Sequence, residues 1–129
     1  MFNFFKKKKV SRVKTFDDAV NFLIKNFNNK NFNNPYWHHN DGRDLRNDLN
    51  LWSNESPIVV FMKNNYGITH ADDISSLILN AAIAKLSDAE FDLKEQSKYY
   101  LDYWDSLHKN GSAELKLKDG IIKIYSIRK

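Results

Sequence analysis

Cysteine is absent from this sequence of 129 residues, and glycine and proline are scarce, with four and two copies. The absence of cysteine excludes disulfides, thiol chemistry and every zinc site that uses cysteine ligands. With so few glycines, a glycine-rich phosphate-binding loop is not expected either. The sequence has neither an apolar run of the roughly 18 residues that a membrane-spanning helix needs nor a secretory signal, so it predicts a cytoplasmic protein.

Positive charge is concentrated near the start of the chain. The formal net charge is +4, and one tract contains Lys6, Lys7, Lys8 and Lys9. Without this tract the chain is close to neutral, whereas a folded nucleic-acid-binding domain usually carries a clustered basic face. We therefore expect residues 1–14 to form a basic, flexible arm. Contact of its lysines with nucleic acid or a membrane surface is the less favoured interpretation.

The most apolar stretch runs from Gly67 to Leu86 and is expected to contain a central helix. Apolar residues occupy nearly every side of this stretch, which is typical of a helix that neighbours bury on several faces. Its front end carries Asp72 and Asp73, two acidic residues that favour the positive end of the helix dipole. Either Asp72 or Thr69 is the expected N-cap.

Four further helices are expected around the central one. The first begins at Thr15, which forms a capping box with Asp18, and its apolar residues recur at helical spacing. In the second, Trp52 is expected on the buried face, and Gly42 is expected in the turn before the helix. The last three of these helices are expected over residues 43–52, 57–66 and 92–110.

The end of the chain predicts a β-hairpin over residues 113–127. Two alternating runs are joined by Asp119-Gly120, which suits a two-residue turn and places Leu117 opposite Ile122. Because an isolated hairpin is marginal in water, its apolar face is expected to dock on the helices. The predicted fold is therefore mainly α, of the α+β class. It is a compact bundle of about five helices around a buried central helix with a C-terminal β-hairpin, in one domain spanning residues 15–129.

Polar residues gather in two segments that helix packing is expected to bring together. We predict a polar junction made of Arg46, Asn47, His70, Asp72 and Asp73. An ion pair between Arg46 and one of the aspartates would be a structural clamp or part of an anion pocket, and the clamp is the favoured interpretation.

The sequence does not support a metal site or a serine hydrolase. The adjacent His38 and His39 do not have the spacing of a known metal-ligand pair, so no metal ligand and no cofactor is predicted. A hydrolase with Ser75 or Ser76 as nucleophile lacks the Gly-x-Ser-x-Gly motif, and a helical serine is more often structural. No catalytic residue is therefore assigned.

Aromatic side chains favour the binding of another protein. The aromatic face of the last predicted helix is wider than one buried stripe requires, and the hairpin has an edge that a partner strand could pair with. The candidate interface residues are Tyr99, Tyr103, Tyr125 and Ile127. We predict a small protein-binding module, such as a toxin-neutralising immunity protein or another inhibitor of one partner. The alternative is an enzyme or ligand-binding domain that uses the polar junction to hold an anion or a metal.

Several motifs resemble those of an uncharacterised bacterial domain family of unknown function. The resemblance covers residues 15–107 and implies a shared fold and a shared polar junction, but no activity. Ala71 and Ile74 stand where that family has proline and methionine. The matching residues are Arg46-Asn47, Leu51-Trp52, Gly67-Ile68, His70, Asp72-Asp73, Ser75, Tyr100 and Tyr103-Trp104.

Overall fold

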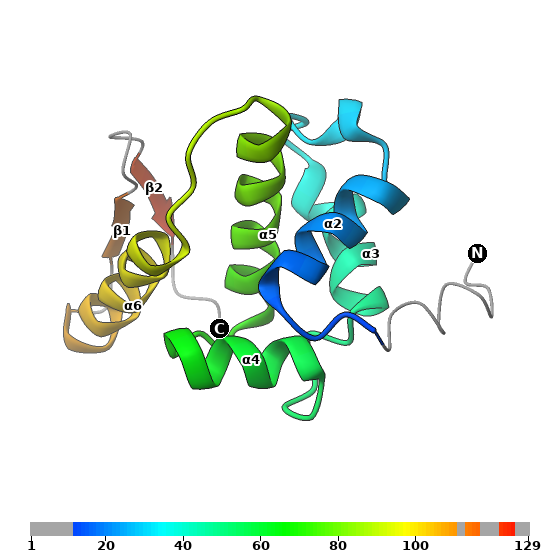
Figure 1. Ribbon diagram of the computed structural model, residues 1–129. Helices are drawn as coiled ribbons and strands as arrows, with labels where there is room; N and C mark the ends of the chain where they lie inside the picture. Colours follow the sequence, from blue (N-terminus) through cyan, green and yellow to red (C-terminus); the bar gives the residue numbers. More distant parts are fainter. Residues whose placement is uncertain (1–11, 111–112, 117–121, 126–129) are drawn as a thin grey trace.

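The fold is a helical bundle arranged around one buried helix (Figure 1). The computed structural model describes residues 12–110, 113–116 and 122–125, and the side chains of residues 12–109. The α-helices in this part are α2 (Phe16–Asn26), α3 (Asp41–Asp48), α4 (Pro57–Tyr66), α5 (Ala71–Leu86) and α6 (Leu93–Asn110). Two 3₁₀-helices, η1 (Asn29–Asn31) and η2 (Trp37–His39), connect α2 to α3. The predicted mainly α bundle is confirmed.

Helix α5 is the central helix that the sequence predicts. Its core-facing side chains include Ile74, Leu77 and Ile78, none of which is exposed to solvent. In Figure 1, α2 and α3 lie on one side of α5, α6 lies on the other, and α4 crosses below. The N-cap is His70, not Asp72 or Thr69, and its side chain makes no capping hydrogen bond. The expected N-cap was therefore wrong by one or two residues, although both aspartates do lie in the first turn.

The ends of α2 and α4 follow local sequence signals. Thr15 Oγ1 accepts a hydrogen bond from the Asp18 backbone at 3.2 Å, and the Asp18 carboxylate accepts one from the Thr15 backbone at 3.0 Å, which completes the predicted capping box. Helix α4 begins at Pro57 and ends before Gly67, whose φ of 72° lies in the left-handed region that glycine adopts without steric cost.

Helix α3 is shorter than the sequence pattern suggests, and this changes the position of Trp52. The helix ends at Asp48, and Asn50 adopts a positive φ of 54°. The chain then turns so that Leu51, with 2% of its surface exposed, occupies the core, while Trp52 is 63% exposed. The prediction that Trp52 faces the core was wrong because the helical period does not continue past Asn50.

Gly42 belongs to the first turn of α3, not to a turn before it. A Cβ atom at this position would lie 2.8 Å from Cζ3 and 3.0 Å from the backbone oxygen of Trp37. Trp37 is only 2% exposed, so its ring packs directly against the backbone of α3. Glycine is required here by close packing, since any side chain would displace the indole.

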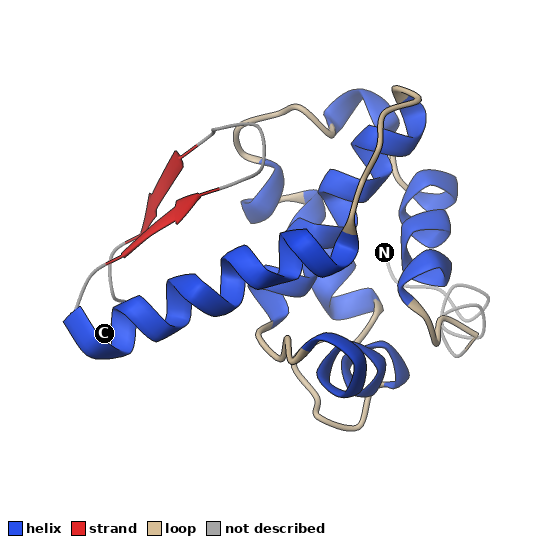
Figure 2. Ribbon diagram, turned by 60° about the vertical axis from the view of Figure 1, so that its left-hand side comes forward, coloured by secondary structure: helices blue, strands red, loops and turns tan. Residues whose placement is uncertain are grey.

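The predicted α+β fold with a docked hairpin needs correction. Within residues 12–109 every regular element is helical. Beyond them, β1 (Ala113–Lys116) and β2 (Ile122–Tyr125) pair antiparallel next to α6, away from the central helix (Figure 2). Lys116 pairs with Ile122, so the register differs by one residue from the predicted pairing of Leu117 with Ile122. The predicted turn at Asp119-Gly120 lies outside the described residues, and the hairpin is not a layer of the bundle.

Candidate functional site

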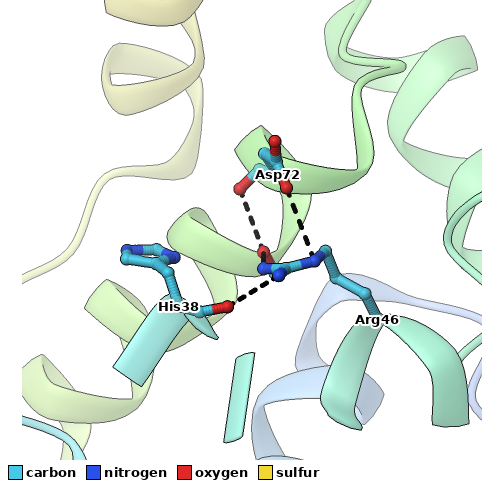
Figure 3. A network of polar contacts seen from close by, with 4 residues as sticks. His38, Arg46 and Asp72 are labelled. Atoms are coloured by element: carbon cyan, nitrogen blue, oxygen red, sulfur yellow. Dashed lines mark hydrogen bonds and ion pairs between the residues drawn. The ribbon is translucent and has the colours of Figure 1, made fainter. Parts of the chain in front are cut away.

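Arg46 is the centre of the polar junction, and α3 places it against the first turn of α5. Only 8% of the residue is exposed. Nη2 donates to the backbone oxygen of His38 at 2.7 Å, and Nη1 donates to Oγ of Ser75 at 3.1 Å. Nε lies 3.4 Å from Oδ1 of Asp72, an ion pair without a well-aligned hydrogen bond (Figure 3). The guanidinium group is thus fixed from three directions.

The charge of Arg46 is balanced by a single, largely exposed carboxylate. Burial lowers the pKa of Arg46, and the neighbouring Asp72 partly offsets this effect. The side chain of Asp72 is 66% exposed, so water screens its attraction to the guanidinium. The ion pair with Asp72 therefore adds little to the stability of the fold.

Trp52 covers the outer side of the same guanidinium group. Cζ of Arg46 lies 5.9 Å from the centre of the Trp52 ring, within the range of a cation–π interaction. Because Trp52 is 63% exposed, most of the indole remains open to solvent. We call the group formed by Trp52, Arg46, Asp72 and His38 the Trp52 surface.

A second cluster connects the start of α5 to α6. Nε1 of Trp104 donates to Oδ2 of Asp73 at 2.7 Å, and the imidazole of His70 stacks on the Trp104 ring at 4.0 Å between centroids. Burial raises the pKa of Asp73 to about 6; the hydrogen bond from Trp104 opposes this rise and the charge of Asp72 adds to it. Partial burial lowers the pKa of His70, and Asp72 counteracts that shift.

The structure divides the predicted polar junction into two parts. Arg46 forms an ion pair with Asp72, which is one of the two predicted alternatives. Asp73 accepts a hydrogen bond from Trp104 instead. His70 lies on the outer face of Trp104. Asn47 is exposed, and no described contact connects it to the junction. No group of three histidine, aspartate or glutamate side chains able to hold a metal occurs in the part of the chain that the structure describes.

Two tryptophans in these clusters were not predicted as site residues. Trp52 was placed in the core by extending the period of α3, and only the tendency of asparagine to adopt a positive φ could have indicated a turn at Asn50. Trp104 is half-buried and packs against the core. No pattern in the sequence indicates that its indole nitrogen bonds Asp73, because the two residues are 31 positions apart.

The candidate interface residues have different positions. Tyr99 is half-buried and packs against the core, and Tyr103 is only 7% exposed. Tyr103 is therefore a core residue in this structure, and its prediction as an exposed anchor needs correction. The side chain of Tyr125, the whole of Ile127 and the lysine tract from Lys6 to Lys9 lie outside the described residues.

Fold and site together define a small helical domain with an arginine-centred junction between α3 and α5. The model of a domain of unknown function, DUF6794, matches residues 13–86, more than half of the chain, and the chain belongs to this family. The match includes Arg46, Trp52 and the start of α5 but ends before α6. The bacterial origin and the specific motifs of the resemblance stay predictions. Neither a curated protein nor a solved structure matches the chain.

A membrane-spanning helix is not found among the described residues. None of the helices there combines the length and the apolar character that crossing a bilayer requires.

Proposed function

We propose that this protein is a protein-binding module whose contact site is the Trp52 surface. The observation that carries the proposal is the exposed indole of Trp52, held over a guanidinium group that three protein contacts fix in place. Tryptophan and arginine are enriched among the residues that dominate binding energy at protein interfaces. An indole exposed in the free protein would gain apolar burial when a partner covers it.

The contacts of Arg46 favour tight binding because they lower the entropic cost of association. A long side chain that becomes fixed on binding costs about 0.5–1.5 kcal/mol, and Arg46 is already fixed. The exposed carboxylate of Asp72 beside it supplies a polar group at the rim of the contact. The surface therefore combines the apolar side chain of Trp52 with polar groups whose positions are already fixed in the free protein.

The test uses substitutions at two exposed apolar side chains near opposite ends of α5. Trp52→Ala removes the anchor, while Leu86→Ala changes a side chain that is 49% exposed and far from the junction. Asp72 and Leu86 are 14 residues apart on one helix, which corresponds to about 21 Å. Tagged wild-type protein is used to isolate a partner from the native host, and the affinity of the purified partner for each variant is measured by calorimetry.

We expect Trp52→Ala to weaken the partner at least about thirtyfold, the effect of losing roughly 2 kcal/mol at a hot spot. Leu86→Ala should bind like the wild type, and both variants should unfold at nearly the wild-type urea concentration. Equal affinity of the Trp52→Ala variant and the wild type would refute the placement of the interface. Failure of the wild type to retain any stoichiometric protein would count against the binding function itself.

The finer part of the proposal is that the partner is a toxin or another enzyme that this protein inhibits in the cytoplasm. The small size of the domain and the kind of surface it exposes support this part of the proposal. The purified partner's activity should fall in proportion to added protein and reach its minimum at equimolar concentration, and cell fractionation should find the protein in the cytoplasmic fraction. Partner activity that is unchanged at saturation would refute inhibition but leave binding intact.

A second candidate function is the binding of a small anion at the start of α5. It is favoured by the guanidinium group of Arg46, which lies against the first turn of α5, where the helix dipole also attracts anions. Titration with inorganic phosphate, followed by the amide signals of residues 70–73, tests it. Saturable shifts that disappear in His70→Ala would support this candidate, and unchanged spectra would exclude it for phosphate.

A further inference from the structure

A pocket at the other end of α5 has the composition of a binding site for an organic cation. Its volume is about 480 Å³, which falls within the range of small-molecule sites. Four aromatic residues line it: Phe16 from α2, Phe61 and Tyr66 from α4, and Phe91 from the segment between α5 and α6. We call this cavity the aromatic pocket. It lies beside Ala81 and Lys85, late in α5, and is separate from the Trp52 surface.

The aromatic walls form two pairs from different parts of the chain. Phe16 and Phe91 are nearly parallel, with an interplanar angle of 8° and 6.0 Å between centroids. Phe61 and Tyr66 are tilted by 51° at 6.2 Å. Phe16 is almost fully buried, whereas Phe61, Tyr66 and Phe91 are half-buried and keep surface available to a ligand. Rings from three elements therefore surround one cavity.

Two carboxylates complete the pocket, Asp17 from the first turn of α2 and Asp88 after the end of α5. Asp17 and Asp88 both line the cavity and are exposed, and neither side chain has an ion pair or hydrogen bond to any residue that the structure describes. Asp88 follows α5 with a φ of 55°, and the backbone of Ala89 donates to Ala84 at 2.8 Å. This left-handed position after a helix is usually glycine or asparagine, so an aspartate there adds a charge that the turn does not need.

Among the described residues of the lining, the one cation is Lys85, and it already makes a hydrogen bond. Nζ of Lys85 donates to Oδ1 of Asn21 on α2 at 2.7 Å and pairs with neither carboxylate. Two carboxylates and one ammonium leave a net negative lining, which repels anions. Aromatic rings attract cations through the negative potential of their faces, and this combination recognises alkylated ammonium groups.

We propose that the aromatic pocket binds an organic ammonium ion with apolar substituents, such as a trimethylammonium group. The alkyl groups contact the four rings, and the positive charge lies between Asp17 and Asp88. A neutral molecule of the same shape gains the apolar contacts only. The proposal therefore predicts discrimination by charge at constant shape.

The test compares choline with 3,3-dimethylbutan-1-ol, its uncharged isostere, at constant ionic strength. Amide signals of the ¹⁵N-labelled full chain are followed during each titration. We expect choline to shift the amides of residues 15–17 and 85–93 and to bind at least about fivefold more tightly than the alcohol. Equal affinities, shifts confined to other residues, or no saturation below roughly 100 mM choline would overturn the proposal.

Three variants assign the discrimination to the pocket. Asp17→Asn with Asp88→Asn should lower choline affinity to that of the alcohol without changing the alcohol's affinity. Phe91→Leu keeps an apolar wall but removes a ring, so it should weaken choline more than the alcohol. Asp102→Asn is the matched control, since Asp102 is an exposed aspartate of α6 outside the lining. Loss of choline binding in this control as large as in the double variant would refute the assignment.

Discussion

Replacing Asp73 by asparagine removes one buried carboxylate and leaves a side chain of nearly the same shape. The amide oxygen of the asparagine can still accept the hydrogen bond that Nε1 of Trp104 donates at 2.7 Å. The main change is the loss of a negative charge that burial disfavours, since the residue is only 9% exposed. Asp73→Asn is therefore expected to stabilise the protein at neutral pH.

The magnitude follows from the difference between the folded and unfolded pKa of Asp73. Its pKa rises from 3.8 to about 6 on folding, so the folded state holds the proton more tightly. Well below pH 3.8 both states are protonated and the contribution to stability is complete. Between pH 3.8 and about 6 the unfolded state has released its proton while the folded state still holds it, so stability falls as pH rises. The total fall is roughly 3 kcal/mol, because each tenfold difference in proton affinity between the two states is worth about 1.4 kcal/mol, and stability changes no further above the folded pKa.

The assay is urea denaturation of the wild type and Asp73→Asn at pH 4, 5, 6 and 7. The difference in unfolding free energy between the two proteins cancels the titration of the other groups, including Asp18, whose pKa backbone hydrogen bonds lower. Relative to its value at pH 4, this difference should shift toward the variant by up to roughly 3 kcal/mol at pH 7. A difference that is independent of pH would refute the assigned pKa. A shift in favour of the wild type would show that the carboxylate stabilises the fold.

Three further substitutions test the packing and capping described above. Gly42→Ala should destabilise by about 0.5–2 kcal/mol, because a clash of about 1–3 kcal/mol with Trp37 exceeds the better helix propensity of alanine. Combination with Trp37→Phe should rescue only part of this loss, because the indole contact is relieved while the Trp37 backbone oxygen remains 3.0 Å away. Thr15→Ala should lower the free energy of unfolding by about 0.5–2 kcal/mol, measured by thermal or urea unfolding, because the N-cap hydroxyl is lost. Thr15→Ser keeps the hydroxyl and should lose much less, so equal losses in the two variants would contradict the capping role. Trp104→Phe should lower the free energy of unfolding by about 1–3 kcal/mol at pH 7, because the Asp73 carboxylate loses its hydrogen-bond donor, and by less at pH 4. An equal loss at the two pH values in urea denaturation would contradict the role of the hydrogen bond.

Local and periodic signals in the sequence were sufficient to predict most of the helical fold. The capping box at Thr15 and the proline and glycine around α4 act through neighbouring backbone atoms, so the sequence contains the whole interaction. The burial of α5 follows from its apolar composition on every side. These features depend little on what the rest of the chain does.

The wrong predictions involve choices between alternatives of similar local energy. An asparagine with a positive φ costs little, so nothing local prevents α3 from ending before Trp52. The hairpin register is a different case, because the alternating pattern favours leucines opposite isoleucines, whereas the structure pairs Leu115 with Lys123 and Lys116 with Ile122. At the site, the prediction left open whether Arg46 pairs with Asp72 or Asp73; the structure pairs it with Asp72, while Asp73 bonds Trp104, 31 positions away in the sequence.

Helix α5 carries the Trp52 surface near its first turn and the aromatic pocket near its last, and between these ends it is packed into the core. Asp72 and Lys85 are separated by 13 residues, or about 20 Å along the axis. Ligands at the two ends cannot touch, so their binding free energies should add unless the whole helix shifts along its axis. By thermodynamic reciprocity, any effect of one ligand on the affinity of the other would have to be equal in both directions. Measuring both affinities would therefore show whether α5, a rigid helix of the core, couples binding at one surface to affinity at the other.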